Sequence, residues 1–110
     1  MKRKKQLFIH GDLNAFGGYG YIPLRNQYWI DLLKKECGDI RDGMQIWLYE
    51  NTQRDGKPDP TIFPGVIKDI GKENEYEIQV DEKDMQYLSE SKEFKDYSVA
   101  DVVDHEEFNR

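Results

Sequence analysis

The chain has 110 residues, of which 37% are hydrophobic and 35% are charged, and its formal net charge is −6 at pH 7. These values predict a single globular domain over residues 1–110 with a strongly solvated surface. They exclude a membrane-spanning helix, because every apolar run is far shorter than the ~20 residues that such a helix needs. The sequence pI near 4.9 disfavours direct nucleic-acid binding, which requires clustered Lys and Arg.

The cellular location is indicated by the cysteine content and by the N-terminus. Cys37 is the single cysteine, so the chain cannot form an internal disulfide, as is usual in a reducing compartment. The basic segment 1–5 is followed by only three apolar residues, 7–9, which are too few for the apolar region of a secretory signal. We therefore predict a cytoplasmic protein with a flexible N-terminal tail at 1–5 and a frayed C-terminus at 104–110.

The first quarter of the chain predicts two short strands joined by a bend. Apolar residues predict one strand at 7–9 and another at 21–24. Between these strands, Gly17, Gly18 and Gly20 are interleaved with tyrosines. Glycine adopts backbone angles that other residues avoid, so this segment predicts a sharp bend.

Residues 26–37 carry the pattern of an amphipathic helix. Asn26 is a suitable N-cap, and Gly38 is a suitable residue to end the helix. The apolar residues that share one face are Trp29, Leu32, Leu33 and Cys37. We expect this face to pack on a sheet, with the Cys37 thiol buried as a small hydrophobic group.

The middle of the chain predicts three consecutive strands. Runs of β-forming residues separated by turn-rich segments occupy 44–50, 61–70 and 76–81. The first run is apolar or aromatic on both faces, so each face needs a cover, whereas the third run alternates as in a sheet with one wet face. Pro64 and Gly65 interrupt the second run, which predicts an edge or bulge and a strongly bent antiparallel sheet.

This meander resembles that of SH3-like small β-barrels. The resemblance rests on a strand that opens at Gly43, a bend at Pro64 and a turn at Gly71, and it extends over residues 44–81. It implies a barrel whose loops and exposed aromatic residues bind a peptide, a protein or a nucleic acid. The predicted helix before the meander and the long segment after it depart from a minimal barrel.

The C-terminal region predicts one further element. Ser98 and Asp101 have the spacing of a helix N-cap and its third residue, which indicates a short helix within 98–107. The apolar side of this helix would be formed by Val99, Val102 and Val103. The predicted fold class is therefore α+β: a bent antiparallel sheet or SH3-like barrel, one packed helix at 26–37 and a short C-terminal helix.

Two groups of residues are candidate binding surfaces. The aromatic group would form either an exposed patch or part of the core, and its members are Tyr19, Tyr21, Tyr28, Trp47 and Tyr49. The second group is acidic, because residues 69–110 carry a net charge of −9 while residues 1–68 carry +3. The third strand carries an outward row of Glu75, Glu77 and Asp81. The full set of residues expected to form the negative face is Glu73, Glu75, Glu77, Asp81, Glu82 and Asp84. This face would either attract a basic protein partner or only solvate the surface.

Three hypotheses of function follow. The favoured one is a non-enzymatic protein that binds a protein partner through the acidic or aromatic surface, as a small bacterial or phage inhibitor or an immunity protein would. The alternative is a barrel module that binds a nucleic acid or a small ligand at the Gly/Tyr segment 17–21. The third is a metal-dependent hydrolase using His10, Asp12 and His105, which no motif supports. We expect no catalytic residue, metal site or cofactor.

Overall fold

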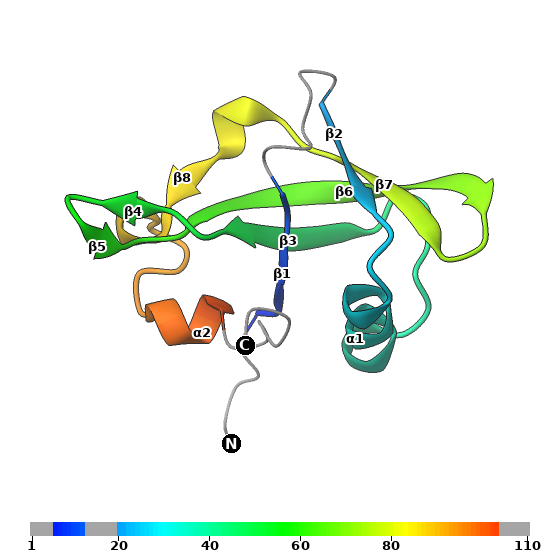
Figure 1. The fold of residues 1–110 in the computed structure, drawn as a ribbon, viewed down its shortest axis with the longest axis horizontal. Helices are drawn as coiled ribbons and strands as arrows, with labels where there is room; N and C mark the ends of the chain where they lie inside the picture. The colour runs from blue at the N-terminus through cyan, green and yellow to red at the C-terminus, as the bar shows by residue number, and fades with distance from the viewer. Residues whose placement is uncertain (1–5, 13–19, 104–110) are drawn as a thin grey trace.

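The structure is a computed structural model that describes residues 6–12 and 20–103. It is a mixed α+β fold in which a curled, open sheet is accompanied by one longer helix (Figure 1). The strands of this sheet are β1 (Phe8–His10), β2 (Tyr21–Leu24), β3 (Gln45–Glu50), β6 (Thr61–Lys72), β7 (Glu75–Gln79) and β8 (Gln86–Tyr87). The remaining elements are the β4–β5 hairpin (Gln53–Arg54 and Lys57–Pro58), the helices α1 (Gln27–Cys37) and α2 (Val99–Val103), and the 3-10 turns η2 (Glu82–Asp84) and η3 (Leu88–Glu90).

The strand order in the main sheet is β1-β3-β6-β7-β2, and β8 pairs with β6 outside this path. The predicted meander is confirmed, because β3 pairs with β6 and β6 with β7, each antiparallel. An entirely antiparallel sheet is the wrong prediction, because β1 runs parallel to β3. A parallel pair requires a long crossover, and here the chain between β1 and β3 contains both β2 and α1.

Helix α1 begins and ends where the sequence predicts. The Tyr28 N–H donates to the Asn26 side chain at 2.9 Å, and Gly38 ends the helix with φ at +84°, in the left-handed region that favours glycine. The buried residues of this helix are Trp29, Ile30, Leu32 and Leu33. Cys37 is exposed, so its predicted burial is wrong. Its angle around the helix fits the buried face, and its exposure therefore follows from its position as the last helical residue.

The core lies between the sheet and its covering segments. Residues from β3, β6 and β7 that are less than a twentieth exposed belong to one buried cluster with α1; they include Ile46, Leu48, Ile67 and Ile78. This is the packing that the apolar stripes predict. Val66 is only half-buried, because it lies on the other face of its strand from Ile67. Met44, which precedes β3, is also half-buried.

The second face of β3 is covered by the C-terminal part of the chain. The Phe94 ring contacts Phe8 and Trp47 edge to face, with centroids 5.0 and 4.8 Å apart. The segment then forms α2, whose predicted cap is confirmed: the Ser98 N–H donates to the Asp101 carboxylate and the Asp101 N–H to the Ser98 hydroxyl. Residues 104–107 of the predicted helix lie outside the described residues.

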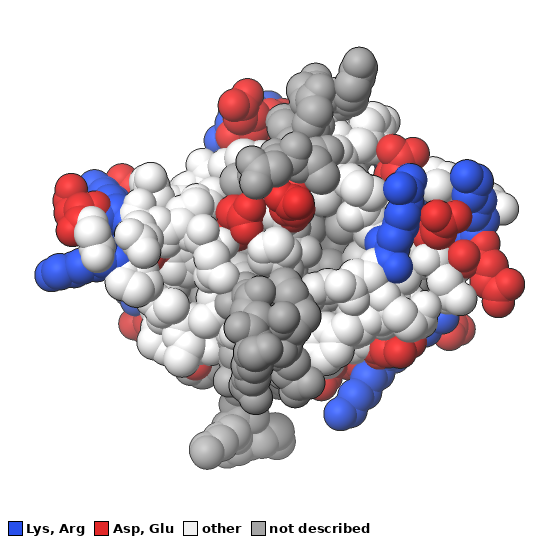
Figure 2. Space-filling view, in the orientation of Figure 1, with Lys and Arg blue, Asp and Glu red and all other residues white. Residues whose placement is uncertain are grey.

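Charged side chains are unevenly placed over this fold. Figure 2 shows them at the two ends of the long axis, over the β4–β5 hairpin and over the turn between β6 and β7, and also at the top of the view over η2 and at the lower right near α1. Neutral side chains occupy most of the visible face between these ends.

Candidate functional site

The most distinctive feature of the sheet is an interruption at Pro64 in the middle of β6. One edge of β6 pairs with β3 from Thr61 to Val66. The other edge pairs with β7 as far as Val66 and resumes with β8 at Ile62. Alternation of hydrogen-bonded pairs places the backbone groups of Pro64 on this second edge. Proline has no N–H to donate, so the pairing of β6 with β7 stops before Pro64. The segment that follows β7 leaves the sheet through η2 and then pairs with β6 again as β8.

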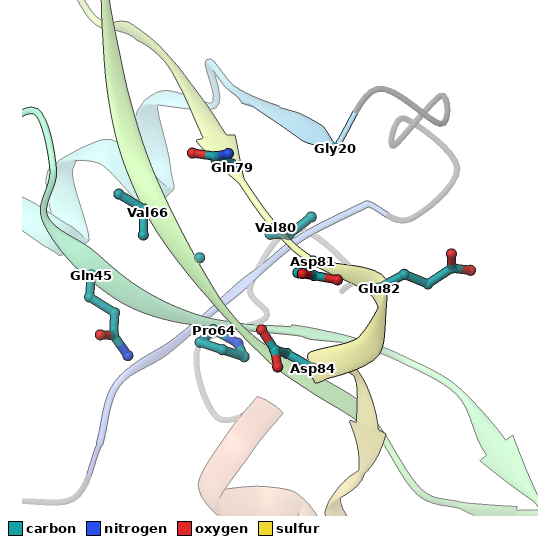
Figure 3. A pocket seen from close by; sticks show the side chains of 10 residues that line it. Gly20, Gln45, Pro64, Val66, Gln79, Val80, Asp81, Glu82 and Asp84 are labelled. Carbon is teal, nitrogen blue, oxygen red and sulfur yellow. The ribbon is translucent and has the colours of Figure 1, made fainter.

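This departure opens a pocket of about 640 Å³, which we call the acidic pocket. Its floor is made by residues of β3, β6 and β7, namely Gln45, Pro64, Gly65, Val66 and Gln79. Its rim is made by Asp81, Glu82 and Asp84, and Gly20 and Val80 complete the lining. Figure 3 shows the Asp84 side chain turned toward Pro64 and the Glu82 side chain directed away from the strands. The pocket thus has an uncharged floor and a carboxylate rim.

The rim carries a net negative charge. The Asp81 carboxylate accepts the Lys83 N–H at 3.1 Å, which caps η2. The Lys83 ammonium lies 3.5 Å from the same carboxylate, but both side chains are more than half exposed, so this pair contributes little. Among the described residues, neither Glu82 nor Asp84 forms an ion pair. Two carboxylates of the rim therefore keep their charge available to a partner.

The floor continues toward the edge strand β2. The register aligns one residue from each of four neighbouring strands on the same face: Gln45, Val66, Gln79 and Tyr21. Tyr21 is the exposed large hydrophobic residue of the described chain, at 36%. Two amides, one aliphatic side chain and one aromatic ring thus form a row that leads out of the acidic pocket. Such a surface offers both hydrogen bonds and apolar contact.

The predicted acidic row on β7 is less negative than the sequence indicates. Glu75 lies 3.4 Å from the guanidinium of Arg25. Lys68 of β6 stands directly opposite Glu77, where an opposite charge stabilises the pair. Asp81 is the one member of the predicted row that lines the acidic pocket. Glu75 and Glu77 thus each have a cation nearby, whereas Glu82 and Asp84 of the rim form no ion pair with the described residues.

The predicted aromatic patch does not form as one surface. Tyr49 is fully buried, and its ring lies 6.4 Å from that of Trp29 in the core. Trp47 is half-buried beneath Phe94. A surface role for the Tyr49 side chain is therefore wrong, and the core alternative holds for it. Tyr21 remains at the surface, and Tyr19 lies outside the described residues.

The described part of the candidate metal site is a pair. The His10 ring nitrogen Nε2 lies 2.7 Å from the Glu50 carboxylate, which joins β1 to β3. The described residues contain no group of three or more His, Cys, Asp or Glu placed to hold a metal ion. His105, the third predicted ligand, lies outside the described residues. Asp12 is exposed, and among the described residues it does not form a three-ligand group with His10 and Glu50.

Sequence reasoning missed much of the acidic pocket. Gln45 and Gln79 of the floor carry no motif, whereas the rim residues Asp81, Glu82 and Asp84 belong to the predicted acidic face. The available signal was Pro64, because a proline inside a predicted central strand indicates a break in pairing. The acidic residues at 81–84 lie just after β7, where the chain leaves the edge of β6 before it pairs with β6 again as β8.

Comparison with protein-family models, curated proteins and solved structures finds no match to this chain. Within the described residues, no helix has the length and apolar character needed to cross a membrane.

Proposed function

We propose that this protein acts by binding, and that the acidic pocket receives an extended, basic segment of a protein partner. Lys or Arg side chains of the partner would pair with the carboxylates of Glu82 and Asp84. Its intervening residues would lie along the row that ends at Tyr21. The observation that supports this proposal most is the combination of an uncharged floor with two rim carboxylates, those of Glu82 and Asp84, that form no ion pair with the described residues.

Charge complementarity favours a basic partner over a nucleic acid. Phosphates would be repelled by the three rim carboxylates, and the whole chain carries −6, so binding would lack the counterion release that drives nucleic-acid association. A basic protein would be steered toward this rim, and its association would weaken as salt shortens the screening length. We propose that such binding blocks the partner, as in an inhibitor or immunity protein of bacterial or phage origin.

A small cationic ligand is the second candidate. Gly20, from the predicted Gly/Tyr ligand segment 17–21, lines the acidic pocket, and residues 17–19 lie outside the described residues. The pocket volume of about 640 Å³ is within the range of small-molecule sites. We also propose that the curled sheet is a variant of the SH3-like barrel, on the strength of its β3-β6-β7 meander and the bend at Pro64 and Gly65.

Selection from a random peptide library tests the proposed function. We expect wild-type protein to enrich peptides that carry Lys or Arg beside apolar residues. The variant Asp81→Asn, Glu82→Gln, Asp84→Asn should bind these peptides at least about ten-fold more weakly, since each exposed pair contributes up to ~1 kcal/mol. Circular dichroism would verify that the variant is folded. Enrichment of acidic or uncharged peptides, or equal binding by the variant, would contradict the proposal.

A further inference from the structure

A second pocket opens on the other side of β8, and its charged rim is mainly cationic. Its volume is about 570 Å³, and it lies between the β4–β5 hairpin, η3 and the segment that leads into α2. In Figure 1 these three segments are grouped at the left end of the molecule. The cations that line it are Arg54, Lys57 and Lys95. We call it the basic pocket, and it shares no lining residue with the acidic pocket.

Arg54 and Lys57 lie opposite each other on the β4–β5 hairpin, and Lys95 lies on the segment that leads into α2. The Arg54 guanidinium is held 3.2 Å from the Glu90 carboxylate, and it lies 5.5 Å from the centre of the Tyr87 ring. Lys57 and Lys95 form no ion pair with the residues that the structure describes. Their ammonium groups are therefore available to an anion that enters the basic pocket.

Two carboxylates also line the basic pocket, and their positions decide whether an anion can enter. Asp59 is 8% exposed, and its carboxylate accepts hydrogen bonds from both the N–H and the hydroxyl of Ser89. These two bonds hold the carboxylate against Ser89 of η3. Asp55 is exposed at the tip of the β4–β5 hairpin, and it forms no ion pair with the residues that the structure describes. Neither carboxylate neutralises Lys57 or Lys95.

Neutral groups complete the lining of the basic pocket. The Ser98 hydroxyl accepts the Asp101 N–H at 3.3 Å, which leaves its own proton free to donate. The apolar part of the lining consists of Pro58, Leu88, Tyr97 and Val99. We infer that the basic pocket binds an oxyanion, a phosphate or a carboxylate, carried on an apolar body. The ammonium groups and the hydroxyl would receive the oxyanion, and the apolar side chains would cover the body.

Titration of the isotope-labelled protein with phenyl phosphate, benzoate and inorganic phosphate tests this inference by NMR. The phenyl compounds should cause saturable shifts of the Ser89 and Val99 amide signals. Phenyl phosphate should bind about ten-fold more tightly than inorganic phosphate, because the ring buries apolar surface. Tighter binding of phenyl phosphate than of benzoate would identify phosphate as the preferred group, and the reverse order would identify carboxylate.

Three lysine variants separate a built pocket from general attraction. Lys57→Gln and Lys95→Gln should each weaken binding of the preferred phenyl compound about five-fold. Lys92→Gln removes an exposed lysine that does not line the basic pocket, and it should leave binding unchanged. The inference would be overturned if neither phenyl compound saturated, or if the double variant Lys57→Gln, Lys95→Gln bound as the wild type does.

Discussion

The acidic and basic pockets lie on either side of the same short strand, β8, yet they present opposite charges. The chain enters β8 through η2, which brings Asp81, Glu82 and Asp84 to the acidic pocket. It leaves through η3, which brings Leu88 and Ser89 to the basic pocket. About ten consecutive residues thus contribute to two sites of different chemistry. The comparison shows that an interruption in strand pairing can place two pockets of different charge close together in the sequence.

The two pockets also differ in how their floors are built. The floor of the acidic pocket is sheet backbone, and Gly65 is buried there. A Cβ atom at Gly65 would lie 2.4 Å from Ile78 Cγ2 and 2.8 Å from Leu48 Cδ1. The basic pocket is instead held by side-chain bonds between Asp59 and Ser89. We therefore expect backbone crowding to damage the first pocket and loss of a single hydrogen-bonding group to damage the second.

The largest effect should come from Gly65→Val. Added side-chain atoms would displace Ile78 and Leu48 from a close-packed core, which should lower the free energy of unfolding by about 3 kcal/mol. Urea denaturation measures this change. Gln45→Val places the same side chain on an exposed floor position, and it should alter stability by less than ~0.5 kcal/mol. Equal midpoints for the two variants would show that Gly65 is not crowded as described.

A smaller loss should follow from Asp59→Asn. The amide keeps the shape of the carboxylate but weakens two charge-assisted hydrogen bonds to Ser89, so we expect a loss of about 1 to 2 kcal/mol. Asp55→Asn removes the same charge at an exposed position of the same pocket and should cost less than ~0.5 kcal/mol. Thermal unfolding of both variants measures the difference. An equal loss of stability in the two variants would show that the hydrogen bonds from Ser89 to Asp59 do not stabilise the fold.

Charge removal should separate the rim of the acidic pocket from the row on β7. Glu75→Gln with Glu77→Gln leaves the rim intact, and Arg25 and Lys68 already neighbour these two residues. We expect this double variant to change the affinity for a selected basic peptide by less than ~0.5 kcal/mol. Glu82→Gln with Asp84→Asn should cost about 1 kcal/mol or more. Calorimetry at low and high salt measures both, and a larger effect from the β7 pair would reverse our assignment.

The smallest effect should be seen at the cap of α2. Ser98→Ala removes one side of the reciprocal bond with Asp101, which should cost about 0.5 to 1 kcal/mol of stability. Ser98→Thr keeps the hydroxyl and should restore most of this loss. Hydrogen exchange of the Asp101 amide is the direct measurement. An unchanged exchange rate in Ser98→Ala would show that the cap does not stabilise α2.

Local patterns predicted the regular elements of this fold, because each depends on neighbouring residues. Asn26 and Gly38 mark the helix, and the alternation after Glu75 marks β7. The parallel pairing of β1 depends on a contact between distant segments, which no local pattern encodes. The same reason hid the cover formed by Phe94 and β8, whose two residues are too few for a periodic signal.

The candidate site was predictable only in part. Acidity beyond residue 69 and the exposure of Tyr21 follow from composition and from strand alternation. The position of Arg25 beside Glu75 could not be foreseen, because it depends on the register between β2 and β7. The burial of Tyr49 likewise results from packing against α1. The sequence predicts a bend or bulge at Pro64, and the structure shows in addition a pocket beside this residue.

The most direct test of the proposed function is an NMR titration of the labelled protein with a short peptide of alternating Arg and Val. Such a peptide is extended and basic, and it should fit the row on the floor of the acidic pocket. The account predicts saturable amide shifts at Gln45, Val66 and Gln79, with little change at Ser89 or Val99 in the basic pocket. Shifts spread over exposed acidic residues elsewhere, such as Glu93 and Asp96, or the absence of saturation would contradict it.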